Sequence, residues 1–157
     1  MLAAHRFAWV PVAGVSVDAD WVALLRQTWI SGFGDVTSGW PWHAYTAAER
    51  AINIIDFSRR FGLPGDLGET RQILARHADI IRGNLEYFGE HYTSNHLSNN
   101  GRALLRIGTA LGRADHAEAG AQIMVAEAGR IFGRSGVATR FKPGYELIFR
   151  LALYEIR

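Results

Sequence analysis

The sequence predicts an all-α fold built from antiparallel helical hairpins. Apolar residues recur at three- and four-residue spacing along most of the chain, and Gly- or Pro-containing segments separate these periodic stretches. The chain has 157 residues, of which 48% are hydrophobic and 20% charged. This length and composition predict one globular domain with a sizeable core.

The first predicted unit is a Trp- and Gly-rich segment over residues 1–43. All five tryptophans lie in it, at Trp9, Trp21, Trp29, Trp40 and Trp42. For any one of them we expect a core position, because Trp contributes a large apolar surface to a core. The stretch 39–43, Gly-Trp-Pro-Trp-His, is predicted to be a loop because it contains Gly and Pro.

Helical hairpins are predicted over residues 44–157. The first helix covers Thr46 to Phe61 and ends at the breaker 62–65, Gly-Leu-Pro-Gly. The second has the clearest stripe, formed by Ile73, Leu74, His77, Ile80, Ile81, Leu85 and Phe88. Since His77 lies on that stripe, we expect it to be a structural core residue.

Three further helices follow. One carries the stripe Leu97, Leu104, Ile107 and Leu111 and ends at Gly112. Asp115 is predicted to cap the next, which runs through Met124 and Ile131 to Phe132. The last begins near Pro143 and buries Leu147, Ile148, Leu151 and Ala152.

Composition narrows the function classes. The formal net charge is +2, and the 17 basic residues, all Arg except Lys142, are scattered along the chain, which disfavours nucleic-acid binding. Arg does suit carboxylate and sulfate recognition through its bidentate geometry. The chain has no Cys, so disulfides and thiolate chemistry are excluded. We expect neither a signal peptide nor a membrane helix.

The segment 95–100, Asn-His-Leu-Ser-Asn-Asn, stands between two amphipathic helices, and Tyr145 follows later. An amide that hydrogen bonds to a carboxylate stabilises the charge that develops on it, and His and Tyr suit proton transfer. β-Elimination from a uronic acid needs these groups. A simpler alternative is that Asn95 is a helix N-cap and Tyr145 a packed aromatic.

Several motifs support the first interpretation. In chain order they are Trp42-His43-Ala44-Tyr45 with Arg50 and Asn53, Asn84-Leu85-Glu86, Ser94-Asn95-His96-Leu97, and Pro143-Gly144-Tyr145. Together they resemble the helical, alginate lyase-like N-terminal domain of the heparinase II/III-type polysaccharide lyases.

The resemblance implies roles for individual residues. Asn95 would neutralise the substrate carboxylate, while His96 and Tyr145 would share the roles of base and acid. Asn99, Arg50, His43 and Trp42 would contact substrate, and the loop 39–43 is the best candidate for a wall that stacks on sugar rings. The substrate would be an acidic polysaccharide, which the sequence does not identify.

The resemblance also implies an incomplete (α/α) toroid, followed in relatives by a β-sandwich domain, and a periplasmic or secreted location. This chain ends at Arg157 without that domain, so we expect a fragment. The chain departs from the family's pattern at a second point. Residues 142–146 read Lys-Pro-Gly-Tyr-Glu, whereas relatives read Ser-Pro-x-Tyr-His. No cofactor is expected in this segment, because His91 and His96 lack the ligand spacing of zinc sites.

Two other functions are open. The first alternative to the lyase is a noncatalytic carbohydrate-binding or helical interaction module. The second is a toroidal glycoside hydrolase. Hydrolysis needs two carboxylates about 5 to 10 Å apart, and Glu86, Glu90 and Asp115 can be nominated for them only arbitrarily.

Overall fold

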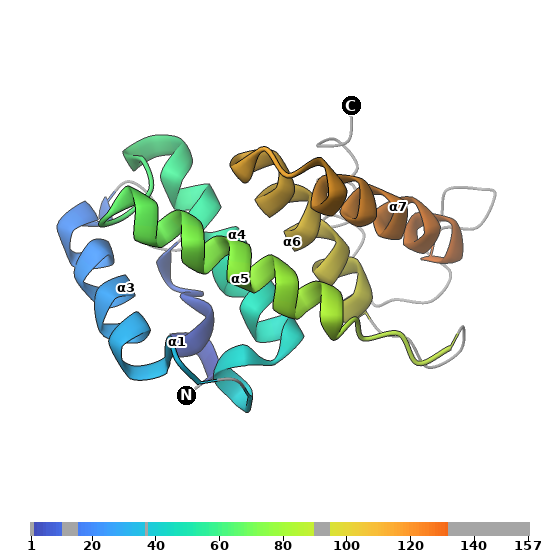
Figure 1. Cartoon of the computed structure of the whole chain (residues 1–157), viewed down its shortest axis with the longest axis horizontal. Coiled ribbons are helices and arrows are strands. Elements are labelled where there is room, and N and C mark those ends of the chain that lie inside the picture. The colour runs from blue at the N-terminus through green and yellow to red at the C-terminus, as the bar shows by residue number, and fades with distance from the viewer. Residues whose placement is uncertain (1, 11–15, 37, 90–94, 132–157) are drawn as a thin grey trace.

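The computed structural model describes residues 2–10, 16–36, 38–89 and 95–131. All regular elements in these residues are helices, which confirms the all-α prediction (Figure 1). In chain order they are α1 (Leu2–Arg6), α3 (Ala19–Phe33), the 3-10 turn η2 (Trp40–Trp42), α4 (Ala44–Phe61), α5 (Leu67–Gly83), α6 (Asn95–Leu111) and α7 (Ala114–Ile131). The predicted helix from Pro143 lies outside the described residues.

Short polar side chains and glycines define several helix ends. The carboxylate of Asp18 accepts from the Trp21 backbone N–H at 3.0 Å, and that of Asp66 accepts from the Glu69 N–H at 2.7 Å, so each caps a helix start. Gly62, with φ of 78°, follows the last residue of α4. Gly112, with φ of 70°, follows α6. Both glycines end helices where the sequence predicts an end.

Two boundary predictions were wrong. The stripe of α5 was expected to reach Phe88, but α5 ends at Gly83 because the Asn84 side chain donates to the Ile80 carbonyl at 2.9 Å. Phe88 is consequently 64% exposed. Asp115 was expected to cap α7 but lies inside its first turn. In that position its negative charge is stabilised by the positive end of the helix dipole.

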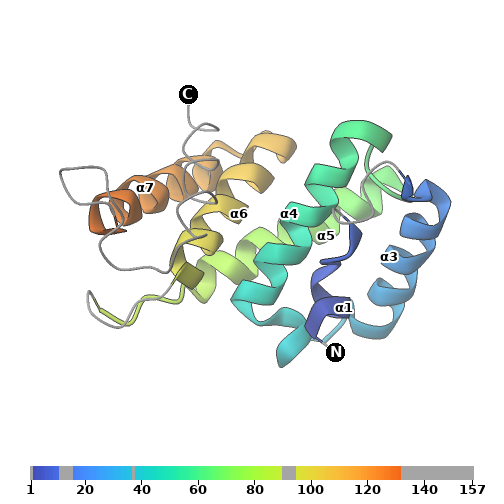
Figure 2. The same cartoon turned by 180° about the vertical axis from the view of Figure 1, so that it is seen from behind.

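Helix α4 occupies the centre of the molecule. Figure 2 shows α4 between α1 and α6, with α3 at the edge beyond α1 and α7 beyond α6, while α5 runs along the face of α4 that is turned toward the viewer in Figure 1. The fully buried residues of α4 include the small side chains Ala47, Ala48 and Ala51, which let neighbouring helices approach closely, and the large side chain Arg50. His77 is 1% exposed, so its predicted place in the core is confirmed.

Helices α6 and α7 pack at the level of the backbone. A Cβ added at Gly108 would overlap the backbone of Ala117, and one added at Gly120 would overlap that of Leu105. Glycine is therefore required at both positions for this close crossing. The predicted motif Asn95-His96 lies in the first turn of α6, the helix that this crossing holds against α7.

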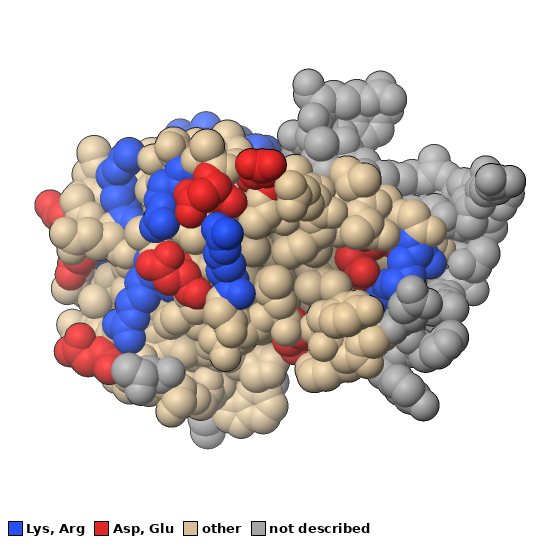
Figure 3. Space-filling view, turned by 45° about the vertical axis from the view of Figure 1, so that its right-hand side comes forward, with Lys and Arg blue, Asp and Glu red and all other residues tan. Residues whose placement is uncertain are grey.

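The surface carries charges of both signs. Figure 3 shows basic and acidic side chains beside one another on this face rather than gathered by sign. Among the described residues, no helix has the length and apolar character required to cross a membrane.

Candidate functional site

The carboxylate of Glu86 joins three segments that are far apart in the sequence. Its Oε1 lies 2.7 Å from Nδ1 of His96, in the first turn of α6, and 3.8 Å from Nε2 of His43, which precedes α4. Glu86 itself follows the end of α5. The shorter distance is that of a charge-assisted hydrogen bond, whereas the longer one exceeds hydrogen-bond range.

Glu86 is held in place from α6. Its backbone N–H donates to Oδ1 of Asn100 at 3.3 Å, and Asn100 is fully buried. Glu86 is only 9% exposed. Burial and the backbone hydrogen bond restrict the carboxylate to a position beside the start of α6.

Aromatic rings surround the two histidines. The Tyr45 ring lies 4.3 Å from the His96 ring, and the Arg6 guanidinium lies 4.8 Å from the Tyr45 ring centre. Trp40 stacks on His43 with ring centres 5.6 Å apart. The cluster thus combines ionisable groups with broad apolar faces, which is a common property of ligand sites.

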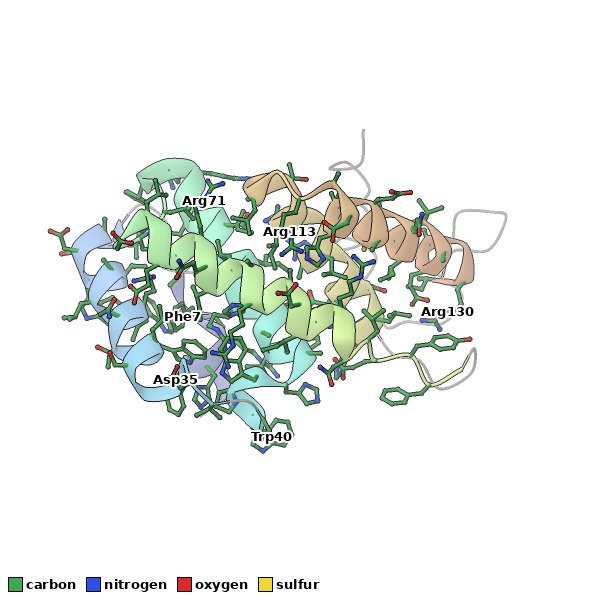
Figure 4. The ribbon with its side chains drawn as sticks, viewed as in Figure 1. Phe7, Asp35, Trp40, Arg71, Arg113 and Arg130 are labelled. Atoms are coloured by element: carbon green, nitrogen blue, oxygen red, sulfur yellow. The ribbon has the colours of Figure 1, made fainter. Side chains whose placement is uncertain are left out.

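A cleft of about 460 Å³ opens beside this cluster. Its walls come from η2, the start of α4 and the end of α5: Ser38, Gly39, Trp40, Trp42, His43, Ala44, Ile80, Asn84 and Glu86. Trp40 is 63% exposed and projects from the margin of the molecule (Figure 4). The loop 39–43, predicted as a sugar-contacting wall, therefore lines a real cleft.

Trp42 connects the cleft to the core. It is 3% exposed, and its Nε1 donates to the Phe33 carbonyl at 2.7 Å. Its ring centre lies 4.8 Å from that of His77 and 5.2 Å from the Arg50 guanidinium. Trp42 is a core residue with one edge on the cleft.

Arg50, predicted to contact substrate, is fully buried and is absent from the cleft wall. Its Nε donates to Nε2 of His77 at 2.8 Å, and its Nη1 donates to the His5 carbonyl at 2.7 Å. The guanidinium lies 3.7 Å from the Trp29 ring centre. In this structure Arg50 reaches the cleft only through Trp42.

The environment of His77 fixes its protonation. Its Nδ1 lies 2.5 Å from the Ile73 carbonyl oxygen, so Nδ1 carries the hydrogen, and Nε2 accepts from Arg50. Burial, followed by the positive charge of Arg50, holds the pKa of His77 well below its ordinary value. Burial likewise lowers the pKa of Arg50. His77 is therefore neutral and structural.

The predicted catalytic residues are partly described. Asn95 is the first residue of α6 and half-buried, next to His96. Asn99 is half-buried one turn later, and its Nδ2 is buried without a hydrogen-bond partner among the described residues. Tyr145 lies outside the described residues. Tyr45 and Asn100 were not predicted as site residues, and Glu86 was named only as a carboxylate for the alternative of hydrolysis, although Tyr45 and Glu86 stand in the quoted motifs.

The contacts of the described carboxylates give little support to glycoside hydrolysis or to a metal site. Glu86 contacts His43 and His96, whereas Asp115 belongs to a separate surface group with Arg82 and Arg113. Glu90 lies outside the described residues. In the part of the chain that the structure describes, no group of three or more His, Asp or Glu side chains is arranged to hold a metal ion.

Comparisons of the chain with protein-family models, with curated proteins and with solved structures found no match.

Proposed function

We propose that this chain is the helical domain of a heparinase II/III-like polysaccharide lyase that cleaves a uronic-acid-containing glycan by β-elimination. One observation carries the proposal. The motifs at 42–45, 84–86 and 95–97 resemble that family in sequence order, and Glu86 brings their ionisable residues into contact beside a cleft. Chance motifs scattered over a helical protein have no reason to converge in this way.

The chemistry assigns one task to each group. Asn95 donates its amide hydrogen to the uronic acid carboxylate, which stabilises the negative charge that develops when the C5 proton leaves. His96 and Tyr145 share the proton transfers: one removes the C5 proton and the other protonates the departing glycosidic oxygen. The C5–H electrons form the C4–C5 double bond as the C4–O bond breaks. The products are an unsaturated uronic acid and a new chain end.

The cleft supplies binding groups for a sugar. Trp40 and His43 line the cleft, Trp40 with an exposed aromatic face, and Asn99 stands on α6 one turn after Asn95. Aromatic faces pack well against the apolar faces of sugar rings. We further propose that the hairpins of α4 to α7 form part of an incomplete (α/α) toroid, and that a β-sandwich domain completes the cleft in longer relatives.

The test is the ultraviolet absorbance of the conjugated double bond while the chain is incubated with a panel of acidic polysaccharides such as alginate and heparan sulfate. A rise with the wild type, abolished in His96→Ala and retained in Thr109→Ala, supports elimination. Thr109 is an exposed residue of the same helix and serves as the matched control. New reducing ends without absorbance indicate hydrolysis instead, and glycan binding without any cleavage indicates a binding module.

A further inference from the structure

Glu86 has no assigned part in the proposed reaction, yet it makes the shortest polar contact of the cluster. Its Oε1 lies 2.7 Å from Nδ1 of His96. A carboxylate oxygen only accepts hydrogen bonds when ionised, so at this distance His96 donates through Nδ1. In the neutral ring, Nε2 is then the nitrogen with the lone pair.

We infer that Glu86 is a positioning residue that fixes His96 in its Nδ1–H form, so that the neutral ring presents Nε2 as the proton acceptor. The assignment of Nε2 to the reaction rests on the proposed function, whereas the tautomer itself does not. Which ring nitrogen of a histidine reacts is set by the hydrogen bond that the other nitrogen makes.

The surroundings restrict Glu86 to this role. It is 9% exposed, its backbone N–H is bound to Asn100, and its Oε1 already faces His96. Glu86 lies at the wall of the cleft, and its Oε1 is already engaged by Nδ1 of His96. His96 is more accessible, with a side chain that is 40% exposed. The buried carboxylate thus orients an accessible ring.

Other contacts limit the motion of the ring. Tyr45 packs at 4.3 Å between ring centres on the side of α4, and His96 stands on the first turn of α6. His43 lies 3.8 Å from the same carboxylate oxygen, too far for a hydrogen bond, so His96 is the histidine that Glu86 orients. A ring held at one nitrogen and packed on one face has a defined direction for the other nitrogen.

The tautomer can be measured without any substrate. Nitrogen-proton correlation spectra of the ring nitrogens distinguish Nδ1–H from Nε2–H, and the His96→Gln spectrum assigns the signals. We expect Nδ1–H in the wild type and in Glu118→Gln, an exposed control on α7 that contacts Gln122. In Glu86→Leu, which removes the acceptor, we expect the Nε2–H form to appear. A wild type protonated only at Nε2, or an unchanged tautomer in Glu86→Leu, overturns the inference.

Steady-state kinetics of the Glu86 variants provide a second test of the inference. Glu86→Leu removes the acceptor, and we expect kcat to fall by about a hundredfold, within the range of a positioned proton-transfer group, with KM little changed. Glu86→Gln keeps the volume and an acceptor, so we expect it to lose less turnover than Glu86→Leu. Full turnover in Glu86→Gln and Glu86→Leu overturns the positioning role. If the wild type eliminates no polysaccharide, the proposed function fails, while the tautomer result still decides the role of Glu86 toward His96.

Discussion

Two histidines of this protein occupy opposite electrostatic settings. His77 lies in the core and accepts a hydrogen bond from the cation Arg50 at 2.8 Å. His96 lies beside the cleft and donates to the anion Glu86 at 2.7 Å. Nδ1 of His77 faces a backbone carbonyl and Nδ1 of His96 faces a carboxylate, so the two rings differ in the charge of their side-chain partners, Arg50 and Glu86.

The difference separates a structural histidine from the one that we propose to react. Protonation of His77 would place a second positive charge next to Arg50 and break their hydrogen bond, so the core keeps the ring neutral. A carboxylate partner has the opposite preference, because it stabilises a positively charged ring. The charge of the side chain that contacts the ring therefore distinguishes the two histidines better than residue type alone.

The largest expected effect is on the core side of this comparison. Arg50→Ala removes a guanidinium that contacts Trp29 and His77 and leaves the His5 carbonyl without its donor. We expect the free energy of unfolding to fall by about 3 to 5 kcal/mol, as for large buried side chains. Chemical denaturation measures this loss. Arg71→Ala on the exposed face of α5 is the control and should change stability by less than about 0.5 kcal/mol. Equal losses would show that Arg50 does not support the core.

On the cleft side, Asn95→Ala should lower turnover by about a hundredfold, equivalent to about 3 kcal/mol of transition-state stabilisation, with the helices intact. Asp18→Ala is the matched control, because Asp18 caps α3 and is predicted to cost about 1 kcal/mol of stability without affecting turnover. Circular dichroism and product absorbance separate the two effects. If Asn95→Ala loses stability without a separate loss of turnover, as expected for Asp18→Ala, then Asn95 only stabilises the start of α6.

The pH dependence of stability sharpens the contrast further. The folded-state pKa of His77 is lowered, so the unfolded chain binds more protons below about pH 6.5 and the protein loses stability as the pH falls. The expected slope is about 1.4 kcal/mol per pH unit for this one group. The pKa of His5 is lowered as well, first by burial and then by Arg50, and adds in the same direction.

Denaturation curves between neutral and mildly acidic pH measure this slope. His77→Gln should flatten it, because the substitution removes the group whose pKa is lowered in the folded state. A slope that persists in full without His77 would mean that another group carries the acid sensitivity.

The helices were largely predictable because local chemistry defines them. The stripe of α4 and its ending at Gly62 were predicted from spacing and a glycine. The end of α5 was not, because the hydrogen bond from Asn84 to the Ile80 carbonyl outweighs an apolar pattern that continues to Phe88. A side chain that competes with the backbone leaves little trace in periodicity.

The site was predictable as separate motifs but not as contacts. His43 and His96 were nominated from the sequence, yet the carboxylate between them depends on how α4, α5 and α6 pack. Arg50 was predicted to contact substrate because the resemblance implies it. The His5 carbonyl, from a segment without a periodic signal, instead helps to hold it in the core.

The smallest expected effect compares two neighbouring tryptophans. Trp40 is 63% exposed at the cleft, whereas Trp42 is 3% exposed and packs on His77. Trp40→Ala should weaken glycan binding by about 1 kcal/mol, roughly fivefold, through the lost stacking face, with an unchanged melting temperature. Trp42→Ala should instead destabilise the fold by about 3 kcal/mol or more. Titration calorimetry with the glycan that gives product, together with thermal melts, separates the two losses. Unaltered binding by Trp40→Ala would place the sugar elsewhere on the protein, because no other cleft residue presents so exposed an aromatic face among the described residues.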